Sequence, residues 1–264
     1  MIKKILIYVL SKVTIRFALF GLNCRRLQLC REFDEYFKST IAFGILKGTK
    51  LSRISLLSWN FLDRANILFG LYEMELVEKI KESAHKSNGT FFDIGAADGI
   101  YCVGLTKNGI FRNAVAFEKS RSGRVRIKQL ADKNEVSEKI EIKGAATIET
   151  LLEIEPSKLQ GAVFLFDIEG AEFEILNALV FQHLSRCNIF IELHFNSQES
   201  SLSFVRDWIQ EKSDLFEVAV FTTGPRDMSE FEELKFHRDS DRWIICSEGR
   251  KNRPMWVHLS PKIA

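Results

Sequence analysis

The chain has 264 residues, of which 46% are hydrophobic and 27% charged, proportions typical of a folded globular protein rather than a disordered one. Only 4 prolines and 15 glycines occur, which excludes collagen-like and low-complexity classes. The formal net charge of +2 conceals an uneven distribution, because residues 1–60 contain 11 Lys and Arg but 3 Asp and Glu, and the remainder is acidic.

Residues 1–60 are predicted to be helical and basic. Their apolar side chains recur at the spacing of one helical stripe: Leu6, Val9, Leu10, Val13, Phe17 and Phe20. Lys12 and Arg16 interrupt the apolar run and no small-residue cleavage site follows, so the segment resembles neither a signal peptide nor a membrane-spanning helix. We expect the stripe to pack on the body of the protein, with dimerisation or contact with a membrane interface as alternatives.

The basic N-terminal segment and the cysteines indicate which partners and which cellular compartment to expect. A basic segment on an acidic body is most often a solvated helix face, but it also suits an anionic partner such as a membrane surface or an acidic glycan. The five cysteines form no C-x-x-C pair, which fits neither a disulfide framework nor a zinc site. Reduced thiols favour the cytoplasm, so we predict a cytoplasmic protein with the option of peripheral contact with the inner membrane.

The rest of the chain is predicted to alternate between strands and helices, after a helix over residues 71–87 and an Asn88-Gly89 turn. The predicted strands are Thr90–Ile94, Ala114–Glu118, Lys139–Lys143, Ala162–Asp167, Asn188–Leu193, Glu217–Thr222 and Arg242–Cys246. The predicted helices are Tyr101–Lys107, Ser122–Lys133, Ile148–Leu152, Ala171–Leu184 and Ser200–Lys212. This order predicts an α/β fold with a mostly parallel sheet, covered on both faces, and an antiparallel last strand.

The first predicted strand ends in a loop with two glycines. Asp93, Gly95 and Gly99 form the pattern D-x-G-x-x-x-G within FFDIGAADGIY, residues 91–101. Glycines at such a turn let a ligand approach the backbone closely, although a tight structural turn also explains them. The spacing differs from the G-x-G-x-x-G of dinucleotide-binding loops, and the G-K-[ST] ending of phosphate-binding loops is missing.

The second predicted strand ends in Glu118, 25 residues after Asp93. Adjacent strand ends of a doubly wound sheet open onto the same crevice, where a carboxylate can accept both hydroxyls of a ribose. We therefore interpret Glu118 as a ribose-binding residue rather than an ordinary surface residue.

A third strand end, FDIEGAE over residues 166–172, supplies Asp167, Glu169 and Glu172. Helix capping explains at most one of these carboxylates. Crowded acids raise one another's pKa, or bind a cation or substrate hydroxyls. The segment is therefore predicted to lie at the mouth of the crevice.

The next strand end, IELH over residues 191–194, places Glu192 and His194 on one face of the strand. His194 is the one histidine of five at such a strand end, and the others are treated as ordinary residues. A lone histidine is usually structural, so the alternative to a catalytic base remains open for His194.

Together these segments resemble the FkbM-type S-adenosylmethionine-dependent methyltransferases, most specifically in the D-x-E-G-x-E block of residues 167–172. The resemblance implies a Rossmann-like, seven-stranded class I methyltransferase fold for residues 70–264, with residues 1–69 as a basic helical extension outside it. The cofactor contacts that it implies are Asp93, Gly95, Ala96, Gly99, Tyr101, Glu118 and Asp167. Lys119 stands where the family often has proline, which leaves the adenine pocket less defined.

The predicted function is methyl transfer from S-adenosylmethionine to a hydroxyl of a carbohydrate, glycolipid or secondary metabolite. His194 is the first candidate for the base that removes the hydroxyl proton, followed by Asp167 and Glu169, while Glu172 and Glu192 are expected to bind the acceptor. No metal ligand is predicted. Two other classes remain open: a nicotinamide-dependent oxidoreductase, disfavoured by the glycine spacing, and a non-catalytic cofactor-binding adapter. Nucleic acid is not an expected partner, because the chain lacks an N/D-P-P-Y-like motif and its body is acidic.

Overall fold

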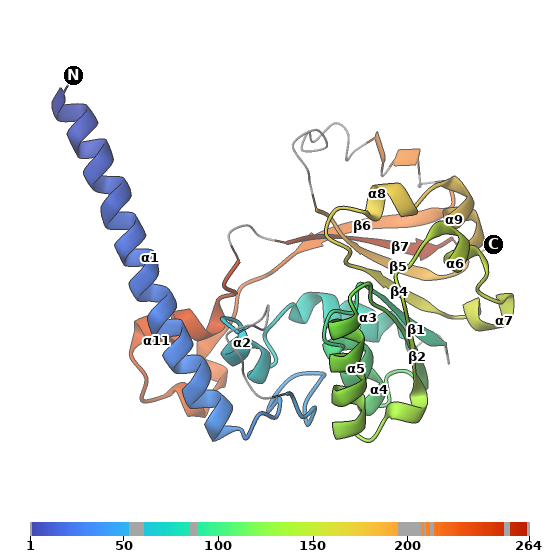
Figure 1. The fold of residues 1–264 in the computed structure, drawn as a ribbon, viewed down its shortest axis with the longest axis horizontal. Helices are drawn as coiled ribbons and strands as arrows, with labels where there is room; N and C mark the ends of the chain where they lie inside the picture. The colour runs from blue at the N-terminus through green and yellow to red at the C-terminus, as the bar shows by residue number, and fades with distance from the viewer. Residues whose placement is uncertain are drawn as a thin grey trace.

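The structure is a computed structural model that describes residues 2–52, 61–84, 89–194, 207–208, 210–211, 214–250 and 254–262, with side chains described from residue 14 onward. Its centre is a seven-stranded sheet in the order β3-β2-β1-β4-β5-β7-β6 (Figure 1). The strands are β1 (Thr90–Ile94), β2 (Asn113–Phe117), β3 (Ile140–Lys143), β4 (Val163–Phe166), β5 (Asn188–Glu192), β6 (Phe216–Thr222) and β7 (Met255–Pro261). Strands β1 to β5 pair in parallel, and β7 lies antiparallel between β5 and β6. This topology confirms the predicted fold class.

Alternating side chains of the central strands fill two cores, one on each face of the sheet. The first core takes Phe91, Ala114, Ala116, Val163, Leu165 and Phe190, and the second takes Phe92, Ile94, Val115, Phe117, Phe164, Phe166, Ile189 and Ile191. The first face is covered by α3 (Met74–Ala84), α4 (Ile100–Lys107) and α5 (Arg121–Lys133), and the second by α6 (Ile148–Leu152), α7 (Pro156–Leu159), α8 (Glu172–Ile175) and α9 (Ala178–His183). Helices on both faces explain why these strands are apolar throughout.

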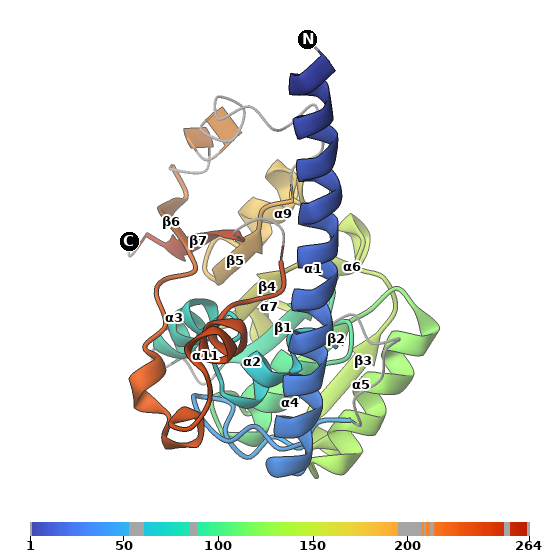
Figure 2. The same ribbon diagram turned by 90° about the vertical axis from the view of Figure 1, so that its left-hand side faces the viewer.

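The N-terminal segment forms one helix, α1 (Ile2–Tyr36), whose two halves have different surroundings. Its C-terminal part packs beside α2 (Arg64–Leu68) and α11 (Asp239–Cys246), and buries Leu29 and Phe33 in the first core. The N-terminal part projects beyond the body (Figures 1 and 2), and residues 14–24 are exposed. The expected packing of the apolar stripe is therefore wrong for Phe17 and Phe20, while the rest of the stripe lies outside the described side chains.

Residues 29–69 contribute apolar side chains to the same core as the sheet, among them Ile41 and Phe69. The division into residues 1–69 and 70–264 stays a prediction. Of the helices that the structure describes, none has both the length and the apolar character needed to cross a bilayer.

Two predicted elements differ from the structure. Arg242–Cys246 is not a strand but the end of α11, because Asp239 and Asp241 occupy its first turn and a short apolar run does not by itself distinguish a strand from a helix. The last strand is β7 instead. The predicted helix Ala171–Leu184 is divided into α8 and α9, because Leu176 leaves the helical conformation and the Asn177 side chain caps α9 by accepting from Val180 N at 3.0 Å.

Short 3₁₀ helices complete the described elements: η1 (Ser137–Lys139), η2 (Met228–Glu230) and η3 (Glu232–Leu234). Most of the predicted helix Ser200–Lys212 lies outside the described residues.

Candidate functional site

A cavity of about 1160 Å³ opens at the carboxyl ends of β1, β2, β4 and β5. Its lining includes Gly95 and Ala97 after β1, Glu118 and Lys119 after β2, Asp167 and Glu169 after β4, and Glu192 and His194 at the end of β5. These strands are neighbours in the sheet, so residues up to 99 positions apart in the sequence meet at one edge. The predicted crevice is thus present, and it contains most of the predicted site residues.

The loop after β1 depends on glycine at two positions. Gly95 has φ +96° and Gly99 has φ +86°, values that side chains rarely permit. A Cβ atom on Gly95 would also overlap the backbone carbonyl oxygen of Asp167. Gly95 therefore allows the β1 loop to lie directly against the end of β4.

Asp93 does not line the cavity. Its carboxylate is buried and accepts a hydrogen bond from the backbone N–H of Cys102 at 3.1 Å. Burial raises the pKa of Asp93 to about 7. Asp93 thus holds the start of α4 in place, and it supports the loop after β1 without lining the cavity.

Three other predicted cofactor contacts, Ala96, Gly99 and Tyr101, are also missing from the described lining of this cavity. The Tyr101 hydroxyl donates instead to the buried carboxylate of Glu73. The loop after β1 reaches the cavity through Gly95 and Ala97.

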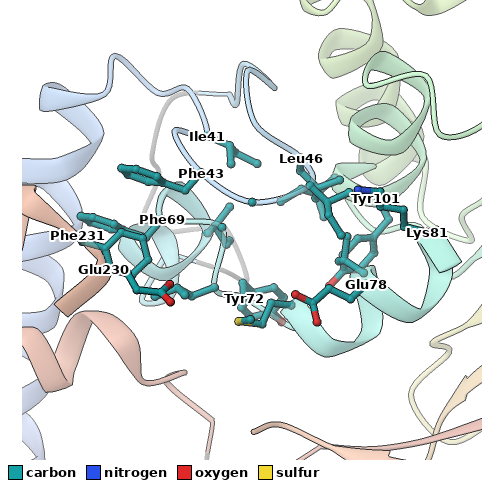
Figure 3. A pocket seen from close by; sticks show the side chains of 18 residues that line it. Ile41, Phe43, Leu46, Phe69, Tyr72, Glu78, Lys81, Tyr101, Glu230 and Phe231 are labelled. Atoms are coloured by element: carbon teal, nitrogen blue, oxygen red, sulfur yellow. The ribbon is translucent and has the colours of Figure 1, made fainter. Parts of the chain in front are cut away.

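Tyr101 lines a second cavity, of about 470 Å³, bounded by Phe43, Phe69 and Phe231 (Figure 3). Tyr72 lines both cavities. The second cavity is largely apolar and lies between α3, α4 and the segments around residues 41–46 and 67–72.

Glu118 joins two loops by its carboxylate. Oε2 accepts the N–H of Ala97 at 3.0 Å, and Oε1 accepts the N–H of Ser120 at 2.6 Å. Gly123, in the first turn of α5, makes room for it, because a Cβ atom there would lie 2.5 Å from Glu118 Cγ. The sequence reasoning missed Gly123, although a glycine inside a predicted helix often has a packing reason.

His194 lies at the centre of the acidic side chains. Its Nδ1 donates to Glu172 Oε1 at 2.9 Å, and Glu172 is fully buried and also accepts the N–H of Ile168. The Nε2 atom faces Asp167 at 3.7 Å and Glu169 at 3.6 Å. Its distance to Glu192 is 3.7 Å.

The charges in this cluster are strongly coupled. Burial raises the pKa of Asp167 to about 6 and that of Glu192 to about 8. Burial alone would lower the pKa of His194, but the hydrogen bond to Glu172 and the charges of Glu192 and Asp167 outweigh it and raise this pKa to about 9. At neutral pH the imidazole is therefore protonated and Asp167 is largely ionised.

The same cluster has donor atoms that suit a metal ion, although no metal ligand was predicted. One donor atom each from Asp167, Glu192 and His194 lies within 4.8 Å of the other two. The hydrogen bond from His194 Nδ1 to Glu172 leaves Nε2 as the ring atom that faces the carboxylates, an orientation typical of metal-binding histidines. The geometry is equally that of an imidazolium surrounded by acids.

Arg250 completes the polar wall, and the sequence reasoning assigned it no role. Its Nη1 donates to Glu192 Oε1 at 2.7 Å, and its Nη2 contacts the Tyr72 hydroxyl and the Glu73 carboxylate. Nε lies 3.3 Å from Glu248. Arg250 thus links β5 to the segment before α3.

The chain matches no protein-family model and no curated protein. Among solved structures, it is similar to precorrin-6y C5,15-methyltransferase from Geobacter metallireducens, with 12% identity, a TM-score of 0.47, and 72% of this chain and 89% of that chain covered. It is also similar to the O-methyltransferase TomG from Streptomyces achromogenes in complex with SAM, with 10% identity, a TM-score of 0.46, and 70% and 80% covered.

A third similar structure is the O-methyltransferase from Bacillus cereus in complex with SAH, with 12% identity, a TM-score of 0.43, and 70% and 81% covered. The fold assignment itself rests on the strand order of this chain. The FkbM resemblance stays a prediction.

Proposed function

We propose that this chain is an S-adenosylmethionine-dependent O-methyltransferase. The observation that carries the proposal is the cavity onto which Gly95, Glu118, Asp167 and His194 open together from the ends of four strands. The family resemblance supplies the identity of the donor, and the strand order is the one that this resemblance implies. Fold alone does not establish function, so the argument depends on the chemistry of the site.

The residues around the cavity suit this donor. Each oxygen of Glu118 accepts one backbone N–H, which leaves lone pairs on both for the hydroxyls of a ribose. On the other side of the cavity, the ionised carboxylates of Asp167 and Glu169 could face the positively charged sulfur of the donor. When bound, S-adenosylmethionine supplies an electrophilic methyl group on a positively charged sulfur.

Asp167 is the base that the electrostatics favour. A hydroxyl needs a group that accepts its proton as the oxygen attacks, and such a group works best unprotonated with a pKa near the working pH. Asp167, with a pKa of about 6, meets that condition, whereas His194, with a pKa of about 9, already holds its proton. The imidazolium of His194 then stabilises the Asp167 carboxylate, and the sequence-based order of the two candidates is reversed.

The acceptor that we propose is a small molecule or glycan with several hydroxyls. Glu169, Glu192 and Asp167 offer several acceptor oxygens at one side of the cavity. A sugar carries several neighbouring hydroxyls that can donate hydrogen bonds to them. Glu172 is not free to contact an acceptor, because it is fully buried beneath His194. Its role in this proposal is to orient the imidazole.

Calorimetric titration of the full chain with S-adenosylmethionine, and separately with NAD, tests the donor. We expect binding of S-adenosylmethionine and none of NAD. Binding of NAD alone would establish the oxidoreductase alternative instead.

A screen of sugars, glycolipids and phenolic metabolites for release of S-adenosylhomocysteine then tests the reaction. Release with a hydroxylated acceptor is the expected result. Two results together would favour the adapter alternative. The chain would bind the cofactor but methylate no acceptor of the screen, and a variant that binds no cofactor would keep its biological function in the cell.

A further inference from the structure

The N-terminal half of α1 carries large apolar side chains that the body leaves uncovered. Ile15, Phe17, Leu19, Phe20 and Leu22 are all exposed, with Phe17 at 73% and Phe20 at 69%. This part of the helix stands clear of the sheet and its covering helices (Figure 1). Ile15, Leu19 and Leu22 share one side of the helix, and Phe17 and Phe20 lie on the other, so apolar side chains are exposed around much of this segment. Exposed apolar surface of this extent on a folded protein usually marks an interaction site.

The charge of the same segment is of one sign. Residues 1–31 contain no Asp or Glu, and their basic residues are Lys3, Lys4, Lys12, Arg16, Arg25, Arg26 and Arg31. Lys12 and Arg16 are four residues apart, so they lie on one side of the helix. Exposed apolar side chains on a segment whose charges are all positive match a surface that is both apolar and anionic.

We propose that the N-terminal half of α1 lies on the surface of an anionic lipid bilayer. The apolar side chains would enter the boundary between headgroups and acyl chains, and the basic side chains of the segment, such as Arg16, would pair with the phosphates. A second copy of the chain is a poorer occupant, because pairing two such helices brings like charges together. The proposal does not depend on the methyltransferase assignment.

The other end of the helix fixes the body relative to that surface. Arg25 pairs with Asp241 through two hydrogen bonds, of 2.9 and 2.7 Å. Arg26 donates to the backbone oxygen of Ser247 at 2.6 Å and to its hydroxyl at 2.8 Å. Ser247 is three residues before Arg250, which lines the candidate site. A bilayer bound by α1 would therefore hold the body of the protein at a defined orientation.

Co-sedimentation of the full chain with vesicles tests the proposal. We expect binding to phosphatidylcholine vesicles that contain phosphatidylglycerol, weak binding to phosphatidylcholine alone, and a loss of binding as salt is raised. The double variant Phe17→Ser/Phe20→Ser should lose binding to both. Lys12→Glu/Arg16→Glu should lose the preference for phosphatidylglycerol, by about fivefold per removed cation.

Phe236→Ser is the matched control, because Phe236 is 95% exposed and lies elsewhere on the surface. It should bind vesicles as the unchanged chain does. Circular dichroism and thermal unfolding of each variant exclude loss of the fold as a cause. Absence of vesicle binding, or binding that Phe17→Ser/Phe20→Ser leaves unchanged, would overturn the proposal. So would a lipid-free dimer that the same variant dissociates and that competes with vesicle binding.

Discussion

At the residue scale, the site depends on how each carboxylate is held. Glu118 is fixed by two backbone donors, Asp93 is turned toward the start of α4, and Glu172 is buried beneath His194. Three acids that look alike in the sequence therefore have different tasks, because their surroundings differ. Only Glu118 and Asp167 of the predicted cofactor acids face the cavity.

Replacing Glu118 by Gln should weaken S-adenosylmethionine binding about 10- to 100-fold, the range for hydrogen bonds that involve a charged partner. Gln keeps the size of the side chain but replaces one acceptor oxygen by a donor. Calorimetric titration measures the change. The control is Glu138→Gln, an exposed position away from the cavity, which should bind as before. Equal affinities of the two variants would remove Glu118 from the donor site.

The rate of methyl transfer should rise with pH through about pH 6 and then level off, because the base that we propose, Asp167, has a pKa of about 6. A rise that continues toward pH 9 would identify His194 as the base instead. The profile is measured with an acceptor from the screen. Asp167→Asn should lower the rate about 10²- to 10⁴-fold and abolish the rise near pH 6.

The free energy of unfolding should fall as the pH rises from about 6.5 to 9. The pKa of His194 is raised from 6.5 to about 9, so the folded state holds a proton that the unfolded state releases; this stabilisation is complete below pH 6.5 and is lost as the pH passes 9. The raised pKa of Glu192 acts in the same direction up to about pH 8. Urea unfolding at several pH values measures the slope.

Glu172→Gln removes the hydrogen-bonding charge on His194 and should flatten this slope. Glu174→Gln, an exposed change in the same helix α8, should not alter it. A slope unaffected by Glu172→Gln would show that Glu172 does not control the protonation of His194.

At the element scale, the start of α5 and the end of β2 form one unit. Gly123→Ala places a Cβ atom 2.5 Å from Glu118 Cγ, so the carboxylate must move away from the N–H of Ala97. Alanine in a helix normally stabilises it by about 1 kcal/mol relative to glycine. The same Cβ atom would lie 2.8 Å from the backbone oxygen of Ala97, so the loop after β1 must also shift. We therefore expect at least a tenfold loss of S-adenosylmethionine affinity (about 1.4 kcal/mol) and a loss of stability that the helix propensity of alanine only partly offsets.

Gly144→Ala is the comparison for Gly123→Ala, because a Cβ atom on Gly144 has open space around it. Its titration and thermal unfolding should match those of the unchanged chain. If Gly123→Ala also retains full affinity, the placement of Glu118 by α5 is not needed for binding.

At the scale of the whole molecule, the last strand of the chain is an interior strand of the sheet. β7 enters between β5 and β6, and Trp256 is fully buried and stacks on Phe221 at 5.4 Å. Trp256→Ala should lower the free energy of unfolding by about 3–5 kcal/mol, because it leaves a large cavity in the core. Trp243→Ala, at a position 58% exposed, should change it by less than about 0.5 kcal/mol. Denaturant unfolding measures the free energy of unfolding of both variants. Similar losses in the two would contradict the conclusion that Trp256 of β7 is part of the core.

The sequence by itself determined the first six strands, the mostly parallel sheet and the edge of that sheet where the site lies. Uniformly apolar segments such as Phe164–Phe166 specify buried strands, and glycines or acids directly after them mark the carboxyl ends. These features depend on local spacing, so neighbouring residues are enough to predict them.

Only the tertiary structure decided which way the site side chains point. His194 meets Glu172 across 22 positions of sequence and Glu192 meets Arg250 across 58, and the apolar run near residue 245 becomes a helix against α1. The same is true of Phe17 and Phe20, whose helical spacing predicted a buried stripe that the body does not cover. Such contacts join segments far apart in the chain, and local spacing carries no information about which distant surface a side chain will meet.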